Sequence, residues 1–136
     1  MPARRARFQQ KWRTGGAVAL TGGVGERLRA ELERVSGGGG RGADHADVAL
    51  GDGPMIQRLE SSIRALASHR GPRSSICPSD AARAVGGDSW RELMDDAREA
   101  ARRLARSAAV EISQRGNVVD PDSEWSGAIR IRTTES

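Results

Sequence analysis

The hydrophobic pattern of this chain changes at Pro54, and this change limits most strongly what the chain can fold into. Residues 1–54 show no sustained helical or strand period, and a run of four glycines occupies 37–40. Beyond Pro54, apolar residues recur every three or four positions. We therefore expect a Gly/Arg-rich arm over 1–54 that is largely disordered, with at most a short helix over 26–35, and a folded domain over 55–136.

The second part of the chain predicts a regular order of elements. Glycine and proline residues separate segments with helical or alternating hydrophobic patterns. The predicted elements are a helix over 55–69, a very short strand at 75–76, a two-turn helix over 78–85, a longer helix over 89–106, a hairpin over 110–120 and a strand over 128–132. This order is typical of a winged helix-turn-helix, in which a small antiparallel sheet closes the open side of three helices.

The third helix and the hairpin are expected to share one core. Ser89 and Glu92 have the spacing of a capping box, which predicts that this helix begins at Ser89. Trp90 and the alanines that follow it mark the inner face of the helix. The side chains that we expect to be buried between helix and ribbon are Leu93, Leu104, Val110, Ile112, Ile129 and Ile131. The predicted fold class is therefore α+β, a small winged helix-turn-helix with a mostly disordered N-terminal arm.

Length and composition exclude several classes of protein. The 136 residues suit one compact domain, and the single cysteine, Cys77, cannot form an intramolecular disulfide. No apolar run approaches the roughly 20 residues that span a bilayer. The net charge is only +4, and Lys11 is the one lysine among the 22 basic residues. We expect a cytoplasmic, non-enzymatic protein that needs no cofactor and no membrane.

Five separated segments carry a resemblance to a known family. They read SICPSDAARAVG, WRELM, ARRLA, VEISQRGNVVDP and GAIRIR. In this order they resemble the bacterial "domain of unknown function 3253" family over residues 55–132. The resemblance implies a small winged-helix fold and supplies no established activity and no catalytic residues. It does not extend to the arm, which is then either an accessory extension or a stretch upstream of the true start codon.

DNA binding is the first functional hypothesis. In this fold the third helix enters a major groove and the wing contacts the backbone or the minor groove. The arginines placed for such contacts are Arg91, Arg98, Arg102, Arg115, Arg130 and Arg132. The first half of the same helix, however, carries four carboxylates, which repel phosphates: Asp88, Glu92, Asp95 and Asp96. Over residues 88–107 five acids balance five arginines.

The alternative is a protein-interaction or dimerisation module that does not bind nucleic acid. A nearly neutral winged helix suits a protein surface as well as a duplex. Salt separates the two hypotheses, because DNA affinity falls steeply with ionic strength and an apolar interface barely changes.

Three further features of the sequence bear on function. The basic N-terminal stretch around Phe8 and Trp12 could hold phosphates and stack bases, although such tails are usually only solvated. Gly22–Gly25 lacks the spacing of a dinucleotide or P-loop motif, so we expect no cofactor there. Cys77 begins the second predicted helix and is a candidate reactive thiol, but more often such a cysteine is a small buried hydrophobe. One cysteine and two histidines supply no metal site.

Overall fold

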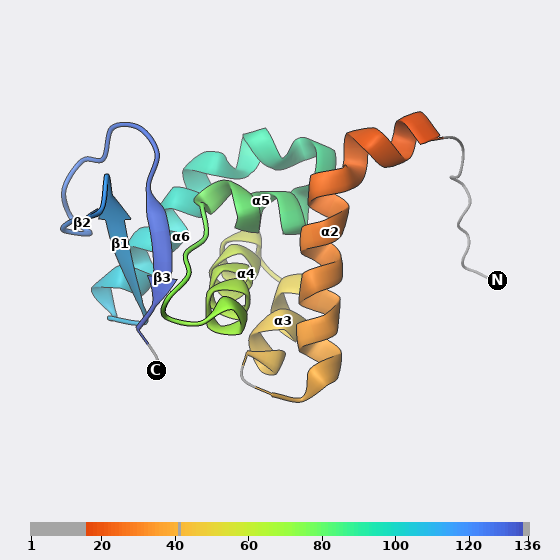
Figure 1. Ribbon diagram of the computed structural model, residues 1–136, viewed down its shortest axis with the longest axis horizontal. Coiled ribbons are helices and arrows are strands. Elements are labelled where there is room, and N and C mark those ends of the chain that lie inside the picture. Colours follow the sequence, from red (N-terminus) through yellow and green to blue (C-terminus); the bar gives the residue numbers. More distant parts are fainter. Residues whose placement is uncertain (1–15, 41, 135–136) are drawn as a thin grey trace.

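The computed structural model describes residues 16–40 and 42–134, and it has the α+β class. A small sheet lies at one end of the molecule and α2 at the other, with α4, α5 and α6 between them (Figure 1). The elements are α2 (Gly16–Gly38), α3 (Ala43–Leu50), α4 (Met55–Arg70), α5 (Pro78–Gly86), the 3-10 helix η1 (Gly87–Leu93), α6 (Met94–Arg106), β1 (Val110–Gln114), β2 (Asn117–Val118) and β3 (Arg130–Thr133).

The sheet is antiparallel, with the strand order β2-β1-β3. Residues Arg115 and Gly116 join β1 to β2 in left-handed backbone conformations, with φ values of 55° and 84°, as tight hairpin turns require. On the far side of β3, Ile76 and Ile131 form a bridge through two backbone hydrogen bonds of 2.8 and 2.7 Å. The very short strand predicted at 75–76 is therefore confirmed as an isolated bridge.

The core lies between the helices and the inner face of this sheet. Val110, Ile112, Ile129 and Ile131 are buried, because alternate residues of each strand point toward α4 and α6. Leu104 is buried with them, whereas the predicted core residue Leu93 is only partly buried against the cluster. The expectation that the ribbon packs on the helices is confirmed.

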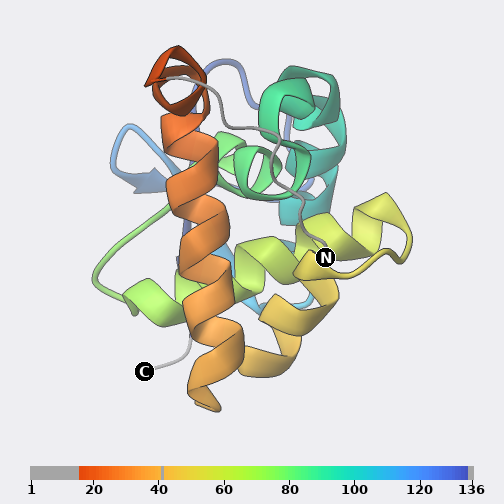
Figure 2. The ribbon, with the colours of Figure 1, turned by 90° about the vertical axis from the view of Figure 1, so that its right-hand side faces the viewer.

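The expectation of a largely disordered arm is wrong for residues 23–40 and 42–50. Leu28, Leu32 and Val35 of α2 are buried, and so are Ala46 and Ala49 of α3. These side chains belong to the same core cluster as those of the sheet and of α4. Figure 2 shows α2 running along the molecule with α3 beside its C-terminal part. Packing of this apolar face stabilises a glycine-rich helix that its own helix propensity would not favour.

The capping box predicted at Ser89 does not form. Gly87 has a φ of 57°, and the chain turns there directly from α5 into η1, so Ser89 lies inside a 3-10 helix. The α-helical part of the third helix begins only at Met94, and no side chain caps it. At α5 the Asp80 carboxylate instead accepts a hydrogen bond of 2.9 Å from the backbone N–H of Cys77.

In the described part of the chain, no helix has the length and apolar character needed to cross a membrane.

Candidate interaction surfaces

The loop between β2 and β3, residues 119–129, folds onto the outer side of α6, and we call it the latch loop. Trp125 anchors it. The indole is 8% exposed, and its Nε1 donates a 3.0 Å hydrogen bond to the carbonyl of Asp120. The guanidinium of Arg102 lies 4.1 Å from the centre of the indole ring, and that of Arg98 lies at 5.8 Å. The latch loop thus brings an aromatic side chain against two helix arginines.

Both arginines also bind backbone carbonyls of the latch loop. Arg98 donates to the carbonyls of Trp125 at 3.0 Å and Gly127 at 3.3 Å. Arg102 donates to the carbonyls of Pro121 and Ser123, the latter at 2.8 Å. Both side chains are partly buried. Their hydrogen-bonding capacity is therefore directed toward the protein's own loop.

Arg106 is a third arginine of α6 that contacts the latch loop. Arg106 pairs with Asp122 at 2.6 Å, although both side chains are about half exposed or more, so the pair contributes little by itself. Through this pair, Trp125 and the carbonyl contacts, the latch loop covers the outer side of the C-terminal half of α6. The sequence predicts Arg98 and Arg102 as contact residues, but it does not show that a loop about 20 residues away covers them.

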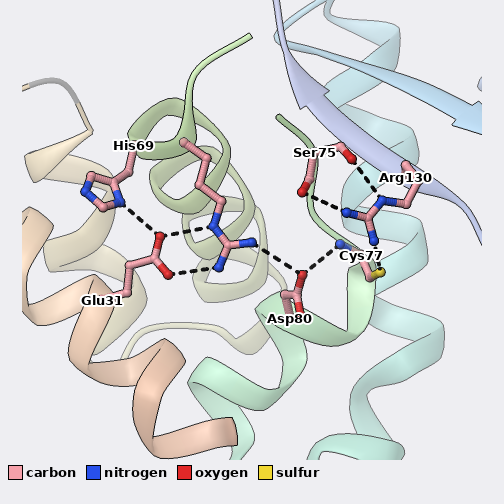
Figure 3. Close-up of polar contacts among 7 residues, drawn as sticks. Glu31, His69, Ser75, Cys77, Asp80 and Arg130 are labelled. Carbon is pink, nitrogen blue, oxygen red and sulfur yellow. Dashed lines mark hydrogen bonds and ion pairs between the residues drawn. The ribbon is translucent and has the colours of Figure 1, made fainter. Parts of the chain in front are cut away.

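Arg130, another predicted contact residue, is held by the segment before α5. Its guanidinium donates to the hydroxyl and the carbonyl of Ser75, both at 2.9 Å, and lies 2.7 Å from the sulfur of Cys77 (Figure 3). Cys77 is partly buried, and a reactive thiol at this position stays a prediction.

The other three predicted residues are exposed and lie apart. Arg91 in η1 has its guanidinium 4.7 Å from the centre of the Trp90 ring. Arg115 lies in the β1–β2 turn. Arg132 of β3 lies opposite Glu111 of β1. The six arginines thus occupy five separate settings, and only Arg98 and Arg102 share one. The contact proposed for the stretch around Phe8 and Trp12 lies outside the described residues.

An acidic stripe occupies the part of the third helix that the latch loop leaves open. Glu92, Asp95 and Asp96 are exposed and have i, i+3, i+4 spacing, which places them on one helix face. Among the described residues, none of the three forms an ion pair. Glu99 follows on the same side, but Arg102 and Arg106 approach it at 3.6 and 4.0 Å.

A polar network that sequence reasoning missed ties α2 to α4 and α5. Glu31 is buried in α2, where it accepts hydrogen bonds from Arg70 at 2.9 and 3.2 Å and lies 2.9 Å from Nδ1 of His69 (Figure 3). Arg70 also approaches Asp80 at 3.9 Å. The one sequence signal was a carboxylate among the apolar residues of the 26–35 pattern, but its partners Arg70 and His69 are nearly 40 positions away in the sequence.

The network shifts the pKa values of Glu31 and Arg70. Burial alone would raise the pKa of the Glu31 carboxyl, but the hydrogen bonds from Arg70 and His69 outweigh this effect and lower it. The hydrogen bond to Glu31 raises the pKa of Arg70. Because Nδ1 of His69 faces Glu31, this nitrogen is not directed at Cys77. In the residues that the structure describes, no group of three or more His, Cys, Asp or Glu could hold a metal ion.

These observations define a small α+β domain in which a β-ribbon and its loop pack on a helical core. The chain belongs to the family described as "Protein of unknown function (DUF3253)", whose model matches residues 56–134. The resemblance that the five sequence segments carry is thereby confirmed. The match extends from α4 to the end of β3, so α2 and α3 lie outside it. None of the curated proteins matches the chain.

Proposed function

We propose that the chain is a winged helix-turn-helix module that binds another protein, and that it has no catalytic role. The order of α4, the bridge residue Ile76, α5, the third helix and the ribbon supports the winged-helix assignment. In this assignment α5 and the third helix, made of η1 and α6, form the helix-turn-helix, and the latch loop belongs to the wing. A cytoplasmic location remains part of the proposal.

The proposal favours a protein partner over DNA because the latch loop covers the outer side of α6. A recognition helix must present its outer side chains to base edges in the major groove. Here Trp125 and four carbonyl contacts of the latch loop engage Arg98 and Arg102. A duplex would have to displace this loop before either arginine could reach a base or a phosphate.

The charge of the open part of the helix indicates the kind of partner. The acidic stripe formed by Glu92, Asp95 and Asp96 repels phosphates and attracts cations. A protein with a basic surface fits this stripe better than a nucleic acid does.

The test captures partners of the full-length chain by cross-linking and mass spectrometry. Charge reversal of the stripe (Glu92→Lys, Asp95→Lys, Asp96→Lys) is expected to remove the partner. The matched control reverses three exposed acids elsewhere (Glu33→Lys, Asp52→Lys, Glu124→Lys) and changes the net charge equally. We expect wild type and control to capture the same basic protein. Capture that survives reversal of the stripe contradicts the proposal.

Nucleic-acid binding stays a second candidate because Arg91, Arg115 and Arg132 are exposed and pair with no acid among the described residues. Fluorescence anisotropy of the full chain with a random duplex at low and high salt tests it. If these three arginines bind phosphates, their replacement by alanine reduces both the affinity and its salt dependence. Salt-dependent binding that the three replacements leave unchanged would instead favour the basic stretch around Phe8 and Trp12.

A further inference from the structure

A cleft of about 660 Å³ lies where α2 passes the junction of α5 and η1. In Figure 1 this is the region where the upper part of α2 meets the ribbon of α5. The volume is within the range of roughly 300 to 1,000 Å³ that is typical of small-molecule sites. The cleft lies at the C-terminal end of α5, whereas Arg130 contacts Cys77 at the N-terminal end of this helix. The cleft includes no residue of the latch loop.

Glycine residues shape the cleft by letting the helices come close. A Cβ atom at Gly25 would lie 3.2 Å from the carbonyl oxygen of Arg83, so a side chain there would push α2 away from α5. Gly86 and Gly87 form the α5–η1 junction on the other wall. The glycine-rich stretch at 22–25 is therefore helical, and Gly25 allows α2 to pack closely on α5.

Three arginines from different elements line the cleft: Arg29 from α2, Arg83 from α5 and Arg91 from η1. None of them forms an ion pair with a described residue. The Nε of Arg83 is buried and has no hydrogen-bond partner among the described residues. A buried donor without an acceptor is costly, and an acceptor oxygen from a ligand would relieve that cost.

Trp90 positions two of the three guanidinium groups. Arg83 lies 4.2 Å and Arg91 lies 4.7 Å from the centre of its ring. These cation–π contacts hold the side chains without using their N–H donors, which therefore stay available. The α5–η1 wall of the cleft thus presents preorganised donors.

We propose that this cleft binds a small phosphorylated molecule, with its phosphate on Arg29, Arg83 and Arg91. One arginine suffices for a carboxylate, which a single guanidinium holds in a bidentate pair, whereas a phosphate has three terminal oxygens and nearly twice the charge. Glu26 and Asp88 also line the cleft and can accept hydrogen bonds from hydroxyl or amino groups on the rest of the ligand. This inference is independent of the proposed protein-binding stripe.

The test titrates the full-length chain with adenosine 5′-monophosphate, using isothermal calorimetry and NMR of the Trp90 indole N–H. Adenosine and inorganic phosphate are titrated in parallel. We expect the monophosphate to bind with a dissociation constant of roughly 1 mM or lower and adenosine to bind more weakly by at least about tenfold. Inorganic phosphate should shift the Trp90 signal as well.

A matched pair of variants separates a built site from general charge attraction. Arg29→Gln removes a cleft arginine, and Arg34→Gln removes an exposed arginine of the same helix that does not line the cleft. The first should weaken binding by about tenfold and the second should leave it unchanged. Arg83→Lys keeps the charge but loses Nε, and it should also weaken binding.

Three results would overturn the proposal. The first is no response to the monophosphate or to inorganic phosphate at about 10 mM, where a site of this kind would be mostly occupied. The second is an equal effect of the Arg29 and Arg34 replacements. The third is a shift of the Trp90 signal by a DNA duplex but not by the monophosphate, which would assign the arginines to a nucleic-acid backbone.

Discussion

At the scale of single residues, Glu31 has the clearest consequence for stability. Its carboxylate is buried between Arg70 and His69, and these partners keep its pKa below the ordinary value of 4.5. Because the folded-state pKa is lower than that of the unfolded chain, the network stabilises the fold above the ordinary carboxyl range. That stabilisation is lost as the pH falls through the lowered pKa.

Replacement of Glu31 should therefore change how stability depends on pH. Glu31→Gln is expected to lower the free energy of unfolding by about 2 kcal/mol at pH 7, because hydrogen bonds to charged groups are lost. The variant should also lose less stability than wild type between neutral and acid pH. Urea unfolding at a series of pH values measures both effects. Glu33→Gln, at an exposed neighbour, is the control, and an acid limb equally steep in the Glu31 variant and wild type would contradict the assignment.

Gly86 is the second residue at which a substitution should be felt. A Cβ atom there would lie 2.6 Å from Cδ1 of Leu93, at the turn from α5 into η1. Gly86→Ala should displace Leu93 and destabilise the protein by about 1 to 3 kcal/mol. Gly53→Ala adds the same methyl group where nothing lies within 4 Å, so it should be nearly neutral. Equal unfolding midpoints for the two variants in urea would argue against a tight Gly86–Leu93 contact.

At the scale of elements, local patterns predicted α4, α5 and the sheet well. The three- and four-residue spacing, the Gly71–Pro72 break and the Arg115–Gly116 turn are all local signals. The form of the third helix was not predicted, because the torsion at Gly87 that starts η1 depends on packing and not on propensity.

The role of α2 and α3 and the state of the arginines also needed tertiary information. Leu28, Leu32 and Val35 do form a helical row in the sequence, but the glycines around them suggested an open chain. The positions of the six candidate arginines were predicted, yet their acceptors are mostly carbonyl oxygens. Every residue, proline included, offers a backbone carbonyl oxygen, so no sequence pattern identifies such partners.

The packing of α2 and α3 predicts that residues 54–136 are unstable by themselves. Removal of 1–53 exposes the faces of α4 and α5 that these helices cover and deletes the ion pair of Glu31 with Arg70. We expect the loss of several buried aliphatic side chains to lower the free energy of unfolding by several kcal/mol. Thermal unfolding followed by circular dichroism measures this. A fragment with the melting temperature of the full chain would show that the two helices are dispensable.

At the scale of the whole molecule, the core includes α2 and α3, and the latch loop covers the outer side of α6. Its open surfaces differ in charge, since the acidic stripe lies on α6 and η1 and the arginine-lined cleft lies beside α2. The first surface suits a basic protein and the second suits a phosphate. Reading of DNA by the third helix requires instead that Arg98 and Arg102 leave the latch loop.

The most direct test of the closed third helix is NMR of the arginine Nε–H groups during titration of the full chain with a DNA duplex at low salt. If the latch loop holds the two guanidinium groups, the signals of Arg98 and Arg102 will keep their positions throughout the titration. Trp125→Ala, which removes the anchor of the loop, should shift both signals even without DNA. Displacement of both signals by the duplex in the wild-type protein would contradict the closed helix and restore it as a DNA-reading element.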